Sequence, residues 1–532
     1  MRLGSAVYIR PGAVGVCAMA VGLLSGQTGP PSQSAVTLRT TTTLIQVNVV
    51  AHDKNGRVIG DIRKYEFEIF DSGKPHIIAT YIPERVGSGP ILAARLLPPG
   101  RFTNRISADP SKQRGYAVIL LDYLNTEFRN TARARRSAIK AVNQVAQGTA
   151  VGLYTLDPLG LHVRAELGSK RADVLTAIDK AIGVAAPCHQ HSLDGLPDDD
   201  MTDCISTGDS PWRRYTEMAT TNRINDTLNA FQAIAGHLKG LPGRKALIWA
   251  TAAFPLQVDL RADGQSLFPN ALGGQKLFSS EVGRAMKALN NADVTLYPVD
   301  SRALSSESPV DAPDDFTWPT INFFAERTGG KAFYGRNDME VGILDAAGDV
   351  EVSYTLGFYV STSGDPDGFH KLAIKTTRPG VTLLYKEGFF TEASKTPKKA
   401  EIQQSGAEAL TKIMDATDIP LDASAVRKGE TLTASIALRP DTQGLEFRNG
   451  RWRGTVGIAA RFAKEDGRQV GNGTAWKLDF ELMQATYYAA LIRGMDFSRS
   501  FTVPKDAERV RLLVRSPSGR IGTLTIPLAE VK

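Results

Sequence analysis

Four continuous hydrophobic runs constrain the fold of this chain more than any other feature. They lie at 116–122, 150–156, 245–251 and 293–299. A strand that is buried on both faces of a parallel sheet has such a run, without the alternation of a half-buried strand. Amphipathic helical patterns separate the runs, at 127–147, 171–182, 217–239 and 279–291. This order predicts an α/β fold with a doubly wound, mostly parallel sheet.

The chain has 532 residues, which is too long for one hydrophobic core. Strand patterns with turn residues between them flank the central runs on both sides, and they predict small β-sandwich-like modules. We therefore expect six segments: a signal peptide at 1–28, an N-terminal β module at 36–84, a linker at 85–114, the α/β domain with a β extension at 115–390, a second linker at 391–425, and a C-terminal β-sandwich-like domain at 426–532.

The N-terminus indicates the compartment. Arg2 and Arg10 precede an apolar stretch at 13–24, and small and polar residues follow it, which is the order of a secretory signal. The stretch is shorter than the ~20 residues that span a bilayer. We therefore expect a secreted, periplasmic or cell-envelope protein without a membrane span.

Three cysteines are present, and Cys17 would leave with the signal. In an oxidising compartment the other two, Cys188 and Cys204, are expected to form a disulfide. His189 and His191 lie between them together with five aspartates. A metal site in this polar loop is the alternative.

The composition and the motifs exclude several function classes. The net charge of +7 is small for this length, so no nucleic-acid partner is expected. No glycine-rich phosphate loop follows the first run, and no Gly-x-Ser-x-Gly nucleophile motif occurs. The basic stripe on the helix at 127–147 is typical of a solvated face. We predict no catalytic residue.

Ligands of open parallel sheets bind outside the carboxyl ends of the strands. The segment Asp122-Tyr123-Leu124-Asn125-Thr126 follows the first run, and it resembles the Asp-x-Ser-x-Ser metal-binding motif of von Willebrand factor A domains. Over residues 44–390 the chain resembles the VWFA-related family that is abundant in acidobacteria. The further segments that carry this resemblance include Pro242-Gly243-Arg244-Lys245, Tyr297-Pro298-Val299-Asp300 and Thr328-Gly329-Gly330-Lys331.

The resemblance implies an exported, non-enzymatic adhesion or interaction protein whose partner is a protein ligand or a cell-envelope component. It implies Mg²⁺ or Ca²⁺ as the ion, with Asp122 and Thr126 as ligands and a further hydroxyl from Thr221 or Thr227. The remaining binding candidates are Asn125, Thr251 and Asp300.

The metal motif is degenerate in this chain. Leu124 replaces the middle serine, and Thr251-Ala252-Ala253 stands where metal-binding A domains have Thr-Asp-Gly, so a second carboxylate is missing. Mg²⁺ prefers six oxygen ligands, and we therefore expect a metal-free site. The alternative function is a metal-dependent hydrolase of the envelope that uses the His189/His191 loop.

Overall fold

The computed structural model places most of the chain in one compact unit, Thr41–Lys532. The residues that it describes are 42–86, 97–105, 115–181, 211–252, 254–260, 266–267, 277–302, 317–361, 369–390, 399–412, 414–439, 445–517 and 519–531. The predicted signal peptide, all three cysteines and the His189/His191 loop lie outside these residues.

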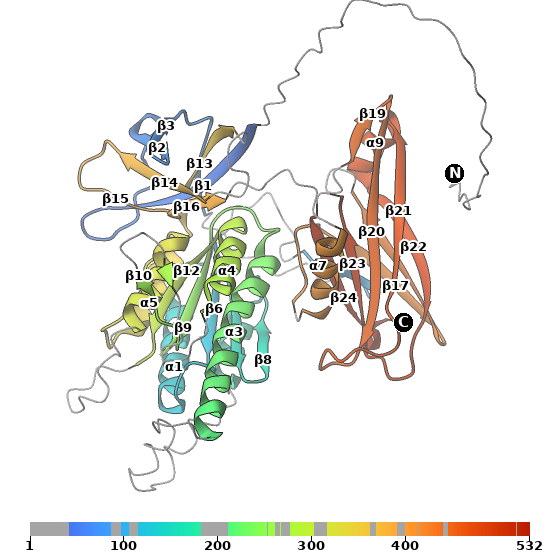
Figure 1. Ribbon diagram of the computed structural model, residues 1–532, viewed down its shortest axis with the longest axis horizontal. Coiled ribbons are helices and arrows are strands. Elements are labelled where there is room, and N and C mark those ends of the chain that lie inside the picture. The colour runs from blue at the N-terminus through green and yellow to red at the C-terminus, as the bar shows by residue number, and fades with distance from the viewer. Residues whose placement is uncertain are drawn as a thin grey trace, which may run out of the picture. The chain divides into compact units, whose positions relative to one another are not determined.

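The four hydrophobic runs form the parallel strands of a central five-stranded sheet (Figure 1). Its order is β12-β9-β6-β7-β8, and the last strand pairs antiparallel with β7. The strands are β6 (Gly115–Asp122), β7 (Thr149–Asp157), β8 (Gly160–Ala165), β9 (Lys245–Thr251) and β12 (Val294–Asp300). Every residue of the four parallel strands is buried, which explains why their sequences do not alternate.

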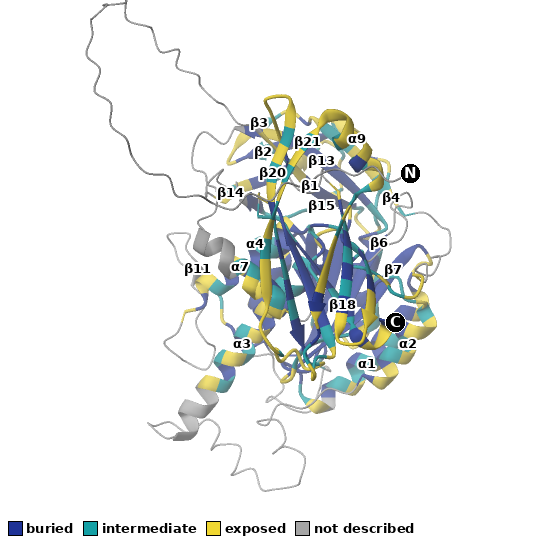
Figure 2. Ribbon diagram, turned by 90° about the vertical axis from the view of Figure 1, so that its right-hand side faces the viewer, coloured by how far each residue is buried: buried dark blue, intermediate teal, exposed yellow. Residues whose placement is uncertain are grey.

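Helices cover both faces of this sheet. Val118 and Leu120 of β6 belong to the hydrophobic cluster with α3, α4 and α5, whereas Ile119 and Leu121 belong to the cluster with α1, α2 and α6. In Figure 2 the central strands are coloured as buried between these layers. The helices are α1 (Phe128–Gln144), α2 (Arg171–Lys180), α3 (Pro211–Leu238), α4 (Ser279–Asn291), α5 (Thr317–Thr328) and α6 (Met339–Gly348), and the short strands β10 (Asp259–Leu260) and β11 (Ser266–Leu267) pair with each other.

A β module combines strands from both sides of the central sheet in sequence. Its two sheets have the orders β15-β1-β13-β4 and β16-β14-β2-β3. They share one core, in which Val47 and Ile69 lie with Tyr354 and Phe358. The elements are β1 (Thr42–His52), η1 (Lys64–Glu66), β2 (Phe67–Asp71), β3 (Lys74–His76), β4 (Thr80–Arg85), β13 (Val352–Ser361), β14 (Phe369–Thr376), β15 (Thr382–Leu384) and β16 (Gly388–Phe390).

The strands of 352–390, which the sequence led us to expect as an extension of the α/β domain, therefore pair with N-terminal strands. β13 aligns with β1 over eight residue pairs from Thr42↔Ser361 to Val49↔Tyr354. Alternating hydrophobicity reports that one face of a strand is buried, but it does not report which sheet the strand joins.

The C-terminal part forms two antiparallel sheets around one core, which fits the predicted β-sandwich. One sheet has the order β22-β18-β17-β5, and the other has the order β19-β20-β23-β24 with β21 paired to β20. The elements are β5 (Arg101–Thr103), α7 (Lys399–Thr411), β17 (Asp422–Lys428), β18 (Thr431–Leu438), β19 (Glu446–Arg448), β20 (Arg451–Ala463), β21 (Thr474–Met483), α9 (Gln484–Arg493), β22 (Met495–Thr502), β23 (Arg509–Arg515), β24 (Ile521–Pro527) and η6 (Leu528–Glu530).

One strand of this sandwich, β5, comes from the predicted linker at 85–114. It pairs antiparallel with β17, and the buried side chain of Asn104 directly follows it. Asn104 Nδ2 donates to the carbonyl oxygens of Ala416 (2.9 Å) and Ile419 (3.0 Å), and its Oδ1 accepts from the amide of Leu421 (2.7 Å). The segment is thus a structural strap and more than a linker.

The predicted fold class is wrong for the molecule as a whole. The fold is mixed α/β but rich in strands, with 42% strand against 28% helix, and it contains several antiparallel sheets. Parallel pairing among the described strands is confined to β6, β7, β9 and β12. The long hydrophobic runs dominated the prediction, although the short half-buried strands contribute more of the structure.

Two further expectations concern the cysteines and the membrane. The described part of the chain contains no cysteine pair that could form a disulfide, and Cys188 and Cys204 both lie outside it, so the disulfide is not retained. Every helix among the described residues is too short or too polar to pass through a bilayer.

Candidate functional site

The candidate site lies at the carboxyl edge of the central sheet and is built around Asp122, the last residue of β6. This carboxylate is buried, with 1% of the residue exposed. Its Oδ2 accepts hydrogen bonds from Asn125 Nδ2 (2.8 Å), Trp249 Nε1 (2.8 Å) and Thr251 Oγ1 (3.1 Å). Its Oδ1 accepts one from the backbone amide of Asn125 (3.0 Å). The neighbouring strand and the following turn thus hold the carboxylate in one orientation.

Burial determines the electrostatics of this carboxylate. Removal from water raises the pKa of Asp122 above its usual range, although the four hydrogen bonds act in the opposite direction. No cation is among the groups that the structure shows hydrogen-bonded to it. The hydrogen bonds that stabilise the Asp122 carboxylate therefore come from uncharged donors.

Asn125 connects this carboxylate to helix α3. Its Nδ2 also donates to Thr227 Oγ1 (2.8 Å), and that hydroxyl donates to the carbonyl oxygen of Arg223 (2.9 Å). Of the two threonines proposed from the sequence, the structure brings Thr227 to the Asp122 cluster. Thr221 lies closer to the start of the helix and is half-buried.

Three buried oxygen atoms at this edge have no hydrogen-bond partner among the described residues: Asn125 Oδ1, Thr126 Oγ1 and Ser301 Oγ. All three residues are less than 5% exposed. Ser301 follows β12, and its amide donates to the carbonyl oxygen of Thr251 at 2.8 Å. Because a buried polar atom without a partner costs about 1–3 kcal/mol, these atoms mark the edge as a place where a ligand could bind.

Asp300 lies at the same edge, because it pairs with Thr251 in the sheet. Its carboxylate is engaged locally. Oδ2 accepts from Arg302 Nη2 (2.8 Å) and Trp318 Nε1 (3.2 Å), and Oδ1 accepts from the backbone amide of Arg302 (2.9 Å). Asp300 therefore fixes the turn after β12.

The donor set fits a divalent cation poorly. Mg²⁺ and Ca²⁺ prefer several oxygen ligands that include carboxylates. Here three donors occupy Oδ2 of Asp122, and Arg302 neutralises Asp300. The oxygens without partners are those of an amide and two hydroxyls. The described residues also contain no group of three or more His, Cys, Asp or Glu side chains that could hold a metal ion. The degenerate, metal-free site expected from the sequence stays a prediction.

Two exposed apolar side chains lie on the rim of this edge. Phe128 begins α1 two residues after Thr126 and is 51% exposed. Leu159 in the β7–β8 turn is 71% exposed. The two segments are joined, because the amide of Leu124 donates to the carbonyl oxygen of Leu156 at 3.0 Å. The edge therefore combines a buried polar cluster with an apolar rim.

Several of the segments that resemble the VWFA-related family meet in a buried network away from this edge. Arg244 Nη2 donates to Tyr297 Oη (2.8 Å) and to the carbonyl oxygen of Gly329 (2.6 Å). Tyr297 donates in turn to Asp349 Oδ2 (2.8 Å), whose Oδ1 lies 2.7 Å from His52 Nε2. These segments therefore connect the central sheet to the β module.

Glycine is required at one point of this network. Gly329 has a φ of 80°, and a Cβ atom there would lie 2.4 Å from the backbone of Tyr385. The Thr-Gly-Gly segment is thus explained by close backbone packing, without a ligand.

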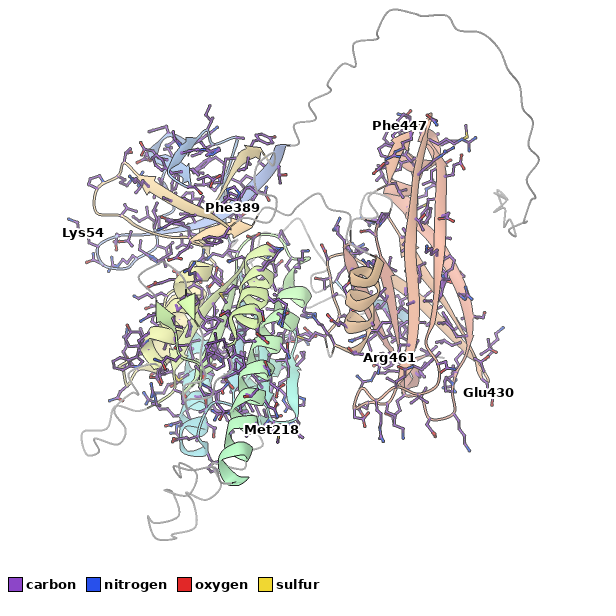
Figure 3. All side chains as sticks on the ribbon, viewed as in Figure 1. Lys54, Met218, Phe389, Glu430, Phe447 and Arg461 are labelled. Atoms are coloured by element: carbon purple, nitrogen blue, oxygen red, sulfur yellow. The ribbon has the colours of Figure 1, made fainter. Side chains whose placement is uncertain are left out.

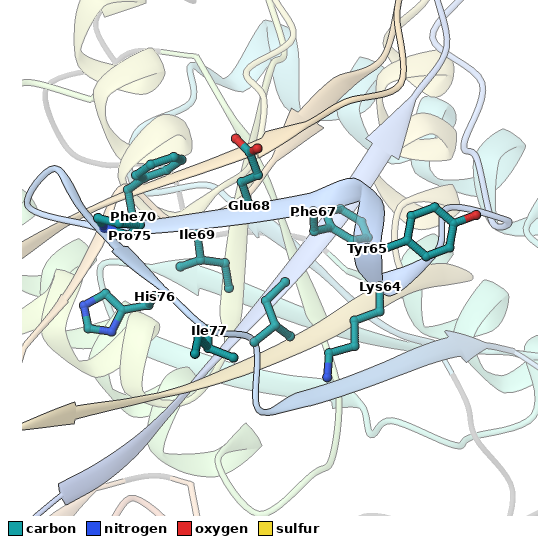
Figure 4. A pocket seen from close by; sticks show the side chains of 10 residues that line it. Lys64, Tyr65, Phe67, Glu68, Ile69, Phe70, Pro75, His76 and Ile77 are labelled. Atoms are coloured by element: carbon teal, nitrogen blue, oxygen red, sulfur yellow. The ribbon is translucent and has the colours of Figure 1, made fainter.

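A separate hollow of about 560 Å³ lies against β2 and β3 in the β module. Figure 4 shows that Glu68 and Phe70 point to one side of β2 and Ile69 to the other. Tyr65 and Ile77 on the lining are 81% and 90% exposed. The charged or titratable side chains on its lining are those of Lys64, Tyr65, Glu68 and His76.

The sequence identified Asp122, Asn125, Thr126, Thr227 and Thr251, which the structure brings together. It missed the contributions of Trp249 and Ser301. The strand-end rule does point to the segment 300–302, in which Ser301 directly follows β12, but it does not single out the Ser301 hydroxyl. Trp249 lies inside the apolar run at 245–251, where its role as a hydrogen-bond donor has no sequence signal.

Comparison with known proteins gives this architecture no family assignment, because no protein-family model matches the chain and no curated protein matches it significantly.

Proposed function

We propose that this protein is a non-enzymatic interaction protein that binds a protein ligand at the carboxyl edge of its central sheet. The observation that carries the proposal is the pairing of two features at one edge. The unpartnered oxygens of Asn125, Thr126 and Ser301 lie there. Phe128 and Leu159 follow β6 and β7 at the same edge and expose apolar side chains.

The environment of Asp122 favours binding over catalysis. A general acid or base needs an oxygen that can exchange a proton with a substrate. Three donors occupy Oδ2 of Asp122, and a backbone amide binds Oδ1. The carboxylate therefore serves to position Asn125 and the turn that leads to Thr126.

The apolar rim supplies the second element of a protein-binding surface. Protein interfaces combine desolvated apolar or aromatic side chains with a few fixed polar groups. The resemblance to the VWFA-related family and the signal-like N-terminus support the same proposal, and they favour an exported adhesion or interaction role.

Site-specific photo-crosslinking tests this proposal. A photoreactive amino acid replaces Phe128 in one version of the full chain and Leu159 in another, and each protein is irradiated with an extract of the cell envelope. We expect the same protein to be crosslinked from both positions, because both side chains flank the same edge. The control carries the photoreactive residue at Ile77 in the β module, which is more exposed than either edge position.

The crosslinked partner is then purified, and its affinity is measured with the wild type and with Phe128→Ser. We expect the substitution to weaken binding by about tenfold, since burial of a phenylalanine contributes about 1.5–3 kcal/mol. Different partners from the two edge positions, the same yield from Ile77, or an unchanged affinity would each contradict the proposal.

Calorimetric titration with Mg²⁺ and Ca²⁺ tests the metal-free form of the proposal. We expect no binding heat, because Asp122 has few unoccupied acceptor sites. Thr126→Val keeps the shape of the side chain and removes the hydroxyl. Heat in the wild type that disappears in Thr126→Val would show instead that the edge holds an ion.

A further inference from the structure

β19 and α9 lie at one end of the C-terminal sandwich (Figure 1). Large apolar side chains are exposed there. Phe447 is 50% exposed, Met483 61%, Tyr488 53% and Ile492 81%. We call these four residues the tip patch. Figure 3 shows Phe447 at this end of the long β20–β21 hairpin. Because exposed apolar groups of this kind mark interaction sites, the tip patch needs an explanation.

Helix α9 has apolar side chains on two faces. On the inner face Ala490 is buried, and the ring of Tyr487 stacks on Trp452 with centroids 3.9 Å apart and planes 8° from parallel. On the outer face the exposed residues Ala485, Tyr488, Ala489 and Ile492 follow the spacing of one helical stripe. Packing against the sandwich accounts for the inner face, whereas the described residues leave the outer face exposed.

Positive charge surrounds the tip patch. The segments 446–453 and 481–493 contain four arginines and two glutamates, namely Arg448, Arg451, Arg453, Arg493, Glu446 and Glu481. Glu446 pairs with Arg448, and Glu481 Oε1 lies 2.7 Å from Arg453 and 3.6 Å from Arg451. The two carboxylates therefore neutralise part of the positive charge, and an excess remains for an anionic partner.

We propose that the tip patch docks on the surface of a lipid bilayer that contains anionic lipids. Aliphatic side chains enter the boundary of the acyl chains, while tyrosine, tryptophan and arginine place polar groups at the level of the headgroups. The tip patch supplies the apolar side chains and a tyrosine, and the neighbouring arginines supply the positive charge, on one short helix and the adjoining hairpin. The proposal is independent of the carboxyl-edge site, because none of its residues belongs to the central sheet.

Vesicle flotation with the full chain tests this inference. One set of vesicles contains phosphatidylcholine alone, and the other contains phosphatidylcholine with phosphatidylglycerol. We expect the wild type to float with the anionic vesicles and to be released by salt, because headgroup attraction is screened. Tyr488→Ser together with Ile492→Ser should weaken this binding by on the order of tenfold or more.

The matched control is Tyr65→Ser together with Ile77→Ser. It removes the same two residue types from more exposed positions of the β module and should leave flotation unchanged. Thermal unfolding checks that both double variants are folded. Three results would overturn the proposal: no flotation of the wild type, equal flotation of the tip variant, or equal flotation with both vesicle types. A wild-type dimer that the tip variant loses, without flotation, would show that a second copy covers the patch.

Discussion

Two buried charged residues of the central sheet are stabilised in different ways. Asp122 has four hydrogen-bond donors. Lys245 at the start of β9 is 2% exposed, and its Nζ donates to the carbonyl oxygen of Leu241 at 2.8 Å. Burial lowers the pKa of Lys245 to about 8, although Asp293 and Glu84 raise it in part. Hydrogen bonds therefore hold the carboxylate of Asp122 in one orientation. The charge of Lys245 changes with pH near 8.

Asp122→Ala is predicted to destabilise the fold more than Asp122→Asn. Alanine leaves the indole of Trp249 and the side chain of Asn125 without their acceptor, which costs about 2–4 kcal/mol. Asparagine retains one acceptor oxygen and removes the buried charge. Chemical denaturation measures both free energies of unfolding, and equal losses would contradict the assigned role of the carboxylate.

Lys245→Met is predicted to change the pH dependence of stability. Burial depresses the folded-state pKa to about 8 from the ordinary lysine value of 10.5, so the unfolded chain binds more protons between these values. The free energy of unfolding of the wild type should therefore rise relative to Lys245→Met by up to about 3 kcal/mol from pH 8 to pH 10.5. Parallel denaturation series of the two proteins measure this difference, and parallel pH profiles would contradict it.

At the residue scale the sequence predicts much of the candidate site. The rule that ligands bind beyond the carboxyl ends of parallel strands leads to Asp122 and Thr126. The resemblance to metal-binding A domains left Thr221 and Thr227 as alternatives, because the choice depends on how α3 packs on the sheet. The rule also could not predict that Trp249 Nε1 donates a hydrogen bond to Asp122 Oδ2. A tryptophan in an apolar run predicts only a buried side chain.

At the scale of elements, β5 is a strand that hydrophobic periodicity could not predict. It has three residues, and a strand of this length has no measurable alternation. Its place in the sandwich depends on its pairing with β17 and on the three hydrogen bonds of Asn104. The long buried strands and amphipathic helices were predictable because their patterns extend over several turns or pairs.

Asn104→Ala is predicted to destabilise the C-terminal sandwich by about 2–3 kcal/mol, because one buried amide and two carbonyl groups lose their partner. Arg101→Ala in the same strand is the control, since Arg101 is exposed and should change stability little. Hydrogen exchange of the β17 amides reports the local effect. Equal exchange in the two variants would show that the strap does not hold this strand.

At the scale of the whole molecule, the β module is assembled from strands that the α/β region separates in sequence. The sequence predicted strands on both sides of that region, but it could not predict that they share one core. Which strands share the core depends on the packing of the side chains of Val47, Ile69, Tyr354 and Phe358. These residues belong to segments that are far apart in the chain. For example, the amide of Ile62 donates a hydrogen bond to Tyr354 Oη across 292 residues.

Removal of residues 1–86 is predicted to expose the apolar face of β13 and β14 and to cause aggregation. Tyr354, Phe358 and Ile374 would lose the partners that now bury them. The control is removal of 1–40, which leaves the unit Thr41–Lys532 intact. Light scattering and binding of a hydrophobic dye distinguish the two, and a monomeric product without 1–86 would contradict the shared core.

The strap formed by β5 also sets an order of events during biosynthesis. Asn104 and Leu421, which exchange a hydrogen bond, are 317 residues apart in the chain. At ~5–20 residues per second, on the order of 15 to 60 s pass between the synthesis of the two. Throughout that interval the strap must stay unpaired while the central strands emerge and fold. The newly made chain therefore has a long interval in which a chaperone can bind it before the pairing of β5 with β17 completes this sheet.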